Sequence, residues 1–339
     1  MPPARFDTPT FGLYNPAMVD IDRKTVSIVV PCYNEAGTLH QFLSALRSVA
    51  ANLTAYDFEF LFVDDGSADD TEPLLLREGA ADPRVRLLCL SRNFGHQRAI
   101  TAGLDSCSGD YVVVMDADLQ DPPALIPEML SHLENGCDLV HTVRENRQTD
   151  TFLKRFTAHV FYAVMRRWVL PDMPENAADF KAFNRKVLVV FQQYRERVRF
   201  LRGLFATLGF KHTEVRYTRP LRCSGVSKYL PRKMLRLARD AFVSNTVLPL
   251  RLGLYLGALC LFTFPFYLLA AGYRYATTPG PNEGLLLVLI GLVWGFSGTI
   301  LALLGALGEY VKCIILEVKQ RPLYIVRAAH NFPKNPFLE

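Results

Sequence analysis

The stretch YVVVMDADLQDPP (residues 111–123) decides the fold, because an apolar strand in it runs directly into a group of carboxylates. Residues 111–115 read as a strand that is buried on both faces. Asp116, Asp118 and Asp121 follow at once. In open α/β sheets, ligands bind at the carboxyl ends of the strands. The stretch therefore predicts a sheet with an acidic, ligand-binding rim.

Strand-like and helix-like segments alternate around this stretch, from about residue 26 to 210. The expected strands are residues 26–31, 58–67, 85–91, 111–118 and 137–143. The expected helices are residues 34–53, 69–81, 93–107 and 124–136, and Asp69 or Asp70 is the expected N-cap of the second. This alternation predicts a Rossmann-like, doubly wound, mostly parallel sheet with helices on both faces.

Two further strands of the predicted sheet end in polar residues, in PCYNE (residues 31–35) and VDDGS (residues 63–67). Asp-Gly-Ser also forms a good turn without any ligand. Three acidic ends on one rim favour a nucleotide-sugar cleft instead. Asp116 and Asp118 can both reach Mg²⁺, which proteins hold with one or two carboxylates plus substrate phosphates. Such a cation would neutralise the charge of a departing nucleoside diphosphate.

Two uncharged runs, residues 252–273 and 285–308, are each long enough to cross a hydrocarbon layer of about 30 Å as a helix. Buried helices of a soluble core are the alternative, but two such runs rarely occur together in a soluble domain. Basic residues flank the pair, and only Arg274 and Glu283 carry charge between the runs. Because basic loops stay on the cytoplasmic side, we expect both termini in the cytosol.

The segment before the first run, residues 211–250, is dense in Arg and Lys. Residues 233–242 within it place apolar side chains at helical spacing. A basic amphipathic helix beside a membrane span is expected to lie in the membrane interface, and an ordinary solvated helix is the alternative. The net charge of +5 suits an anionic membrane surface better than nucleic acid.

Several stretches resemble the inverting family 2 glycosyltransferases with the GT-A fold: SIVVPCYNEAGTL, VDDGSADDT and SRNFGHQRAITAGLDSCSGDYVVVMDADLQDPP. Within that family the chain is similar to the polyprenyl-phosphate glycosyltransferases, such as dolichyl-phosphate mannose synthase and, closer, the bacterial bactoprenol glucosyltransferases. Further matching pieces are ADFKAFNRKV, SGVSKY and GEYVKCIILEVKQRPLYIV, so the resemblance runs from about residue 26 to 326. QQYRE (residues 192–196) has Glu where processive synthases of the family carry Trp, which argues against a polymer-building enzyme.

This resemblance and the hydropathy pattern together predict the domain organisation. The expected parts are an N-terminal tail over residues 1–25, a GT-A catalytic domain over 26–225, interfacial amphipathic helices over 226–250, transmembrane helices over 251–274 and 285–309, and a cytoplasmic tail over 310–339. The protein would be a multi-pass protein of the cytoplasmic (inner) membrane. The bacterial relatives also imply a homo-oligomer, with a tetramer among the candidates.

The resemblance implies a role for each matching residue. Asp118 and Gln120 would hold Mg²⁺ or Mn²⁺. The nucleotide sugar would contact Pro31, Tyr33, Glu35, Asp64, Asp65 and Asp116. The acceptor phosphate would contact Arg144, Arg147, Arg222 and Lys228. The catalytic set would be Asp116, Asp118, Asp179, Arg144, Arg147 and Lys228.

Without the resemblance, several of these positions have plainer interpretations. Arg144 and Arg147 would then belong to a solvated loop, and VDDGS to a turn. His96 and His141 have no partner at metal-ligand spacing, so we interpret both as structural or loop residues.

The expected reaction moves one sugar from a nucleotide sugar, UDP-glucose or another UDP-hexose, to undecaprenyl phosphate for modification of a cell-envelope glycan. GDP-mannose and UDP-4-amino-4-deoxyarabinose derivatives stay open as donors. A lipid phosphate with a second pKa near ~6 is already a competent nucleophile, so Asp179 is either a base or a sugar ligand. The rival hypotheses are a non-catalytic sugar-binding scaffold on the same fold and a polysaccharide synthase, for which two spans are too few.

Overall fold

Strands and helices alternate along the chain in the predicted order. The computed structural model describes residues 23–144, 177–218 and 283–332, with scattered positions between 253 and 277. Its strands are β1 (Lys24–Cys32), β2 (Tyr56–Asp64), β3 (Val85–Leu90), β4 (Tyr111–Val114), β5 (Leu139–Arg144), β6 (Ala177–Asn184), β7 (His212–Tyr217) and β8 (Val326–His330). Its helices are α1 (Ala36–Asn52), α2 (Thr71–Ala81), α3 (His96–Ser106), α4 (Ile126–Glu134), α6 (Arg185–Gln193), α7 (Leu201–Thr207) and α10 (Glu283–Val318), and the 3₁₀ turn η1 (Pro123–Leu125) precedes α4.

The strands form a single sheet in the order β7-β5-β6-β4-β1-β2-β3-β8. β1 pairs in parallel with β2 and β4, β2 with β3, and β5 with β7. Two strands run the other way: β6 between β4 and β5, and β8 beside β3. The predicted mostly parallel sheet is therefore confirmed, and the carboxyl ends of β1 to β5 meet at the same edge.

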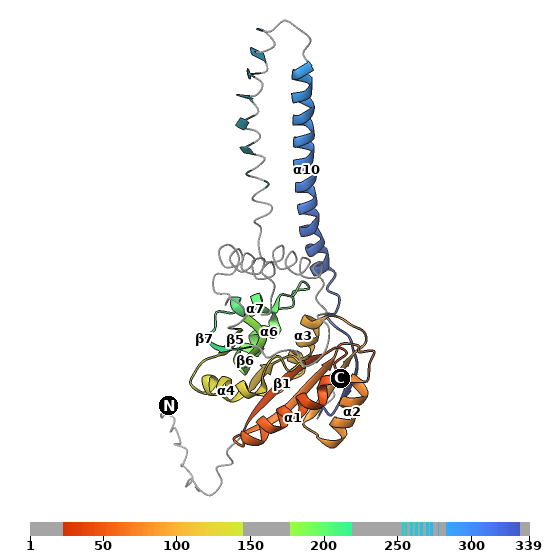
Figure 1. Ribbon diagram of the computed structural model, residues 1–339, viewed down its shortest axis with the longest axis vertical. Coiled ribbons are helices and arrows are strands. Elements are labelled where there is room, and N and C mark those ends of the chain that lie inside the picture. Colours follow the sequence, from red (N-terminus) through yellow and green to blue (C-terminus); the bar gives the residue numbers. More distant parts are fainter. Residues whose placement is uncertain are drawn as a thin grey trace, which may run out of the picture.

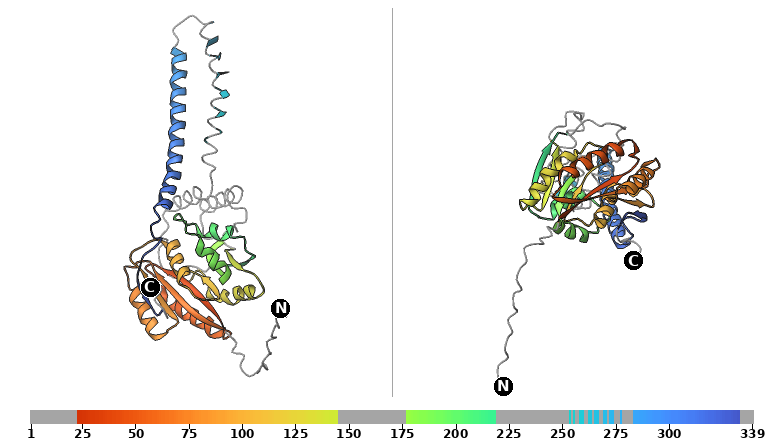
Figure 2. Two further views of the ribbon diagram at one scale, coloured as in Figure 1. Left: turned by 180° about the vertical axis from the view of Figure 1, so that it is seen from behind. Right: turned by 90° about the horizontal axis from the view of Figure 1, so that it is seen from below.

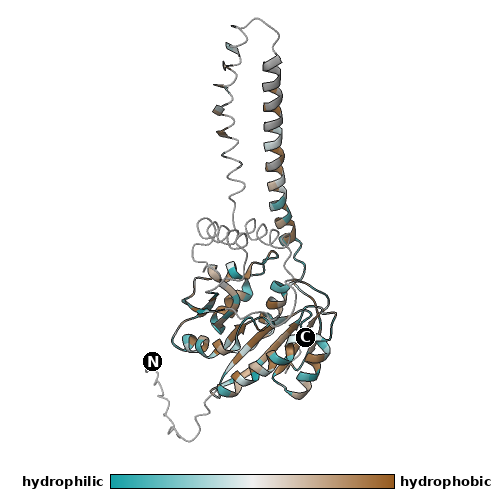
Figure 3. Cartoon of the chain, viewed as in Figure 1, coloured by the Kyte–Doolittle hydropathy of each residue, from teal (hydrophilic) through white to brown (hydrophobic). Residues whose placement is uncertain are grey.

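Helices cover both faces of this sheet (Figures 1 and 2). α1, α2 and α4 pack on one face, where Phe42 of α1 meets Phe62 of β2 with ring centroids 6.3 Å apart. α3, α6 and α7 pack on the other face, where Phe205 of α7 contacts both Phe183 and Phe191. The strands between the layers are the most hydrophobic part of this domain (Figure 3), as expected for a sheet buried on both sides.

Helix α3 lies unusually close to the sheet because Gly103 has no side chain. A Cβ atom at this position would lie 2.3 Å from Val29 Cγ1 and 3.1 Å from Val63 Cγ2. The close approach matters for function, since α3 begins at His96, next to the rim, and runs away from it along the sheet. The glycine therefore sets the position of the helix that carries His96.

The predicted second span, residues 285–309, lies inside the longer helix α10. Among the described residues, one stretch is long and apolar enough to cross a membrane: Phe296–Val318, with a mean hydropathy of 1.8 and no part buried inside the protein. Only scattered positions of the first predicted span, residues 251–274, are described. That span, the interfacial helices at 226–250 and nearly all of the N-terminal tail lie outside the described residues and stay predictions.

The segment after α10 returns to the sheet. Leu87 and Leu88 of β3 pair with His330 and Ala329 of β8, and Ser91 N donates a hydrogen bond to the carbonyl oxygen of Ile325 (2.9 Å). The region expected to be a C-terminal tail, residues 310–339, thus contains the end of α10 and an edge strand. Sequence periodicity could not indicate this strand, because its partner lies far away along the chain.

Replacing Gly103 by alanine is expected to lower the free energy of unfolding by about 1–2 kcal/mol, because the new methyl group overpacks against Val29. The same change in a chain that also carries Val29→Ala is expected to raise stability, since the methyl then fills the vacated space and alanine favours helix. Thermal unfolding of the four purified chains in detergent measures both effects. Gly37→Ala in α1, where nothing lies within 4 Å, is the control. Equal destabilisation by Gly103→Ala in both backgrounds would contradict the packing argument.

A second prediction concerns His141 of β5, which is 2% exposed and has a buried Nδ1 without a hydrogen-bond partner among the described residues. Burial, with the nearby charge of Lys181, lowers the pKa of His141 to about 3, whereas an unfolded histidine titrates near ~6.5. The unfolded state therefore binds more protons between these values. The stabilisation that comes from neutral His141 is fully present above pH ~6.5. It is lost as the pH falls below this value, and the free energy of unfolding then decreases by at most about 1.4 kcal/mol per pH unit. His141→Asn should flatten this dependence in denaturant titrations, and His40→Asn, at an exposed position on α1, should leave it unchanged.

Candidate active site

The carboxylates that follow β4 lie at the edge of the sheet where the parallel strands end. The Asp116 side chain is 27% exposed, whereas Asp118 is 8% exposed and Asp121 is fully buried. Leu119 has a φ of 59°, a left-handed conformation that turns the chain sharply. In this turn Gln120 N donates to Asp118 Oδ1 (3.1 Å) and Asp116 N to Asp121 Oδ2 (3.4 Å). The turn thus gathers the three carboxylates that the sequence places after the strand.

His96, the first residue of α3, lies between two of the acids of the site. Its Nε2 is 3.6 Å from Asp116 Oδ1 and 3.6 Å from Asp179 Oδ2. Burial alone would lower the pKa of the imidazole, but the charges of Asp116 and Asp179 outweigh it and raise the pKa to about 9. His96 is therefore a cation at neutral pH and holds the ends of β4 and β6 together.

Asp179 of β6 is bound on its other side by Arg202 of α7. Arg202 Nε donates to Asp179 Oδ1 and Arg202 Nη2 to Asp179 Oδ2, each at 2.9 Å. Burial would raise the pKa of Asp179, but the guanidinium and the hydrogen bond from His96 lower the pKa well below its usual range. A carboxylate with so low a pKa is a weak base, which disfavours one of the two roles expected for Asp179.

Sequence reasoning missed both His96 and Arg202. The interpretation of His96 as a structural or loop residue overlooked its place between two carboxylates of the site. One signal was available: His96 follows the end of β3, so it belongs to a fourth strand end on the same rim. For Arg202 no signal was available, because its pairing with Asp179 depends on how α7 packs against β6.

Asp121, the third acid of the opening stretch, anchors a second cation. Its Oδ1 accepts a hydrogen bond from the Tyr217 hydroxyl (2.8 Å) and lies 3.9 Å from Arg144 Nη2. Arg144 Nε donates to the same hydroxyl (3.2 Å). Burial, followed by the charge of Asp116, raises the pKa of Asp121 to about 6. The ends of β5 and β7 are thereby tied to the acidic turn, with Arg144 fixed beside it.

The loops after β1 and β2 form another part of the rim and are bonded to each other. Asn34, in a left-handed conformation with φ 55°, donates through its backbone N to Ser67 Oγ (2.9 Å), and its Oδ1 accepts from Ala68 N (2.8 Å). Asp69 Oδ2 accepts from Ala36 N (3.2 Å). Tyr33, directly before Asn34 in this loop, is 39% exposed.

The sequence predicted either Asp69 or Asp70 as the N-cap of α2, and each residue fulfils part of that prediction. Asp70 occupies the N-cap position of α2 but makes no side-chain bond to the helix. Asp69 Oδ1 accepts from Thr71 N (3.1 Å) instead.

The two acids of VDDGS have different surroundings. Asp65 accepts hydrogen bonds from Phe94 N (2.7 Å) and Gly95 N (2.9 Å), so it holds the loop that leads into α3. Asp64 is fully buried and accepts from Ser67 N (3.1 Å). Both side chains are almost fully enclosed, since Asp65 is only 2% exposed, and contact of Asp64 with the nucleotide sugar stays a prediction. Contact of Asp65 with a nucleoside stays a prediction.

The predicted site residues that are described lie on one rim. Pro31 is buried at the end of β1, and Tyr33 and Glu35 follow it. Asp116, Asp118, Gln120, Arg144 and Asp179 lie at the ends of β4, β5 and β6. Three predicted acceptor residues, Arg147, Arg222 and Lys228, lie outside the described residues.

Comparison with known proteins shows the family to which the chain belongs. The sequence model of Glycosyl transferase family 2 matches residues 27–191. Over 306 residues the chain is 41% identical to the uncharacterized glycosyltransferase YkcC of Bacillus subtilis. The matched region spans 90% of this chain and 94% of that protein. It is 35% identical over 309 residues to the bactoprenol glucosyl transferase of Shigella phage SfII, and the matched region spans 90% of this chain and 98% of that protein.

Among solved structures, glucosyl-3-phosphoglycerate synthase from Mycobacterium tuberculosis in complex with Mn²⁺, UDP-glucose and phosphoglyceric acid superimposes with a TM-score of 0.43 at 18% identity, over 64% of this chain and 76% of that one. The matches in sequence, at up to 41% identity over nine tenths of the chain, decide the family. The chain belongs to glycosyl transferase family 2 and is a glycosyltransferase.

Proposed function

We propose that the enzyme transfers a single glucose, or another hexose, from a UDP-sugar to polyprenyl phosphate at the cytoplasmic face of a membrane, with inversion at the anomeric carbon. The observation that carries the proposal is the charge pattern of the rim. There the carboxylates of Asp116, Asp121 and Asp179 alternate with the cations of His96, Arg144 and Arg202. Extensive identity to a bactoprenol glucosyl transferase supports the lipid phosphate as acceptor and glucose as the sugar.

A divalent cation fits the donors of this rim. Asp118 offers a mostly enclosed carboxylate and Gln120 an amide oxygen, which are ligands that Mg²⁺ and Mn²⁺ accept. Burial raises the pKa of Asp116, and the charge of Asp118 adds to the rise. A cation beside them would relieve this repulsion. When bound, it would neutralise the charge of the leaving nucleoside diphosphate. The two metals fit equally well.

The nucleoside would lie between the ends of β1 and β2. Tyr33 presents an exposed ring, Glu35 follows on the same loop, and Asp65 borders the loop from the other side. A ring can stack on a base, and carboxylates can accept from ribose hydroxyls. The sugar would then extend toward Asp116 and His96. The choice of UDP over GDP rests on the bacterial relatives.

The attacking group would be an oxygen of the lipid phosphate, which needs no strong base because it is already an anion near pH 7. Asp179 suits a different task. Held by Arg202 and His96, it presents a fixed carboxylate that can accept hydrogen bonds from sugar hydroxyls. Arg144 would receive the acceptor phosphate, because a guanidinium matches phosphate geometry and can bring two anions into line. Arg147, Arg222 and Lys228 would complete this acceptor site.

Attachment to the membrane would bring the acceptor within reach. α10 supports this, since Ile300, Leu301 and Leu304 are each more than half exposed on a helix with an apolar stretch of spanning length. Large exposed apolar surfaces mark contact with lipid or partners. A second span over residues 251–274, the interfacial helices, cytosolic termini and a homo-oligomer belong to the same proposal.

Asp118→Ala is expected to lower sugar transfer by at least about 100-fold while the protein stays folded, because the cation loses its enclosed carboxylate. The assay measures UDP release from UDP-glucose with undecaprenyl phosphate and Mg²⁺, with and without a chelator. Asp57→Ala, which removes an exposed carboxylate at the other end of the sheet, is the matched control. Full activity in Asp118→Ala would refute the metal role. If the wild type releases no nucleotide from any of a panel of nucleotide sugars, the non-catalytic scaffold is the better hypothesis.

Tyr217→Phe is expected to raise the KM for polyprenyl phosphate about tenfold with little change in the KM for the donor. The hydroxyl that joins Arg144 to Asp121 is lost, and a hydrogen bond to a charged group contributes about 1.5 kcal/mol or more. Tyr194→Phe, at an exposed tyrosine after α6, is the control. An equal rise in both KM values would show that Tyr217 supports the whole site and not the acceptor side alone.

A further inference from the structure

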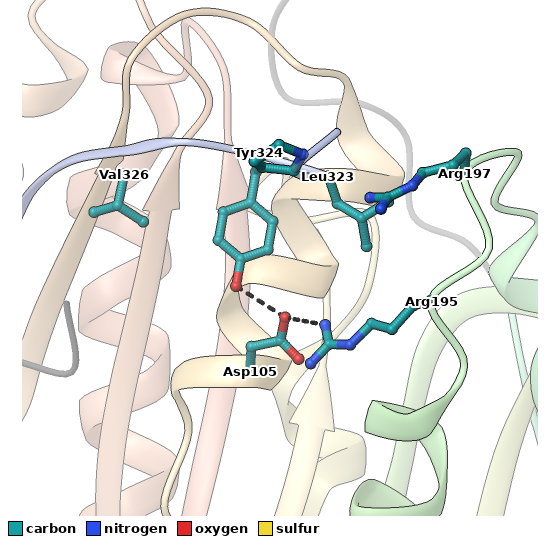
Figure 4. A pocket seen from close by; sticks show the side chains of 7 residues that line it. Asp105, Arg195, Arg197, Leu323, Tyr324 and Val326 are labelled. Atoms are coloured by element: carbon teal, nitrogen blue, oxygen red, sulfur yellow. Dashed lines mark hydrogen bonds and ion pairs between the residues drawn. The ribbon is translucent and has the colours of Figure 1, made fainter. Parts of the chain in front are cut away.

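A cavity of about 390 Å³ lies away from the candidate active site, under the segment that connects α10 to β8 (Figure 4). It is lined by Asp105, Arg195, Arg197, Pro322, Leu323, Tyr324 and Val326. Asp105 lies near the end of α3 and His96 at its beginning. At 1.5 Å per residue, roughly 14 Å of helix separate this cavity from the acidic rim. The cavity is therefore a separate site on the same helix.

The floor of the cavity is built around one carboxylate. Tyr324 and Arg195 reach Asp105 from different sides (Figure 4): the Tyr324 hydroxyl donates to Asp105 Oδ2 at 2.8 Å and Arg195 Nη1 donates to the same oxygen at 2.6 Å. Arg199 lies nearby and is 7% exposed, and its Nε and Nη2 have no hydrogen-bond partner among the described residues. Asp105 Oδ2 is thus engaged by two neighbours, whereas the buried Asp105 Oδ1 has no hydrogen-bond partner in the described part of the chain.

Arg197 supplies the positive charge that remains available. Its backbone N donates to Glu317 Oε1 (2.6 Å), but among the described residues its guanidinium makes no hydrogen bond and no ion pair. The charged side chains of the lining are two guanidiniums and one carboxylate, and the carboxylate of Glu317 lies beside the Arg197 backbone. An anion would therefore bind to the Arg197 guanidinium itself and not to a large positive surface. A planar guanidinium with several donors suits phosphate in particular.

The position of the cavity indicates where the phosphate comes from. Glu317, which bonds to Arg197, lies one residue before the end of α10 and of its apolar stretch. If the stretch Phe296–Val318 is the part of α10 that spans the bilayer, the cavity adjoins the headgroup layer, which extends about 5–8 Å beyond the hydrocarbon on each side. Leu323 and Val326 add apolar surface to the lining. This combination of apolar lining and unpaired guanidinium suits a phospholipid better than a free ion.

We infer that this cavity binds the phosphate group of a membrane-lipid headgroup, distinct from the acceptor lipid, and that Arg197 is its principal contact. The lipid source rests on the proposed membrane position of α10, whereas the phosphate site itself does not. A soluble phosphate would use the same contacts. The segment 320–326, which the sequence comparison singled out without a role, would then hold a structural lipid beside the enzyme.

The test compares the full-length wild type with Arg197→Gln and with Arg77→Gln, which removes the same charge from an exposed position on α2. Native mass spectrometry counts phosphatidylglycerol retained after detergent exchange, with phosphatidylcholine as the second lipid. Thermal unfolding in increasing inorganic phosphate forms the soluble arm. We expect Arg197→Gln to bind phosphatidylglycerol at least tenfold more weakly and Arg77→Gln to match the wild type. Arg197→Lys keeps the positive charge but loses the planar guanidinium, so we expect its affinity for phosphatidylglycerol to lie between those of the wild type and Arg197→Gln. This variant also controls for an effect of Arg197→Gln on folding.

Each outcome decides the inference. Loss of lipid in Arg197→Gln alone supports the headgroup site. Unchanged lipid with loss of the phosphate-dependent rise in melting temperature supports a soluble phosphate as the ligand. Equal behaviour of Arg197→Gln and Arg77→Gln in both arms overturns the site. Sugar transfer is measured on the same samples: transfer without any phosphate site overturns this inference alone, and a phosphate site without transfer by the wild type overturns the proposed function alone.

Discussion

The site depends on holding several carboxylates close together against their mutual repulsion. Asp116, Asp118, Asp121 and Asp179 crowd one edge of the sheet, and burial makes their charges costly. Each cation that offsets this repulsion comes from a different element: His96 from the start of α3, Arg144 from the end of β5 and Arg202 from α7. The rim is therefore formed only when these elements dock, and folding of the domain and assembly of the charge pattern are the same event.

Much of this could be predicted from the sequence, because local patterns carry it. Apolar runs that end in acids gave the strands, their parallel order and the rim, since both hydrophobic burial and strand ends can be seen within a few residues. The side-chain pairings that complete the site could not be predicted from such local patterns. Asp64 and Asp65 are neighbours in sequence, yet one is buried against Ser67 and the other holds the loop before α3. Which of two adjacent acids faces a ligand depends on the direction of each side chain and not on composition.

The pairing of the two antiparallel strands also could not be predicted from local sequence patterns. β6 lies between β4 and β5, and β8 is the edge strand beside β3. Neither strand has a sequence pattern that indicates which strand it pairs with. The place of β6 matters for function, because it brings Asp179 next to His96. The segment between α10 and β8 adds two further contacts: the Tyr324 hydroxyl donates to Asp105 of α3, and the Ile325 carbonyl oxygen accepts from Ser91 N, just after β3.

The edge strand also constrains how the protein is made. A ribosome delivers β3 long before β8, with roughly 240 residues between them. At about 5–20 residues per second, the backbone groups along β3 stay unpaired for roughly 10–50 s, a period in which an open sheet edge invites pairing with another chain. The edge of the sheet beside β3 is covered only after α10 has left the ribosome, because β8 follows α10 in the chain.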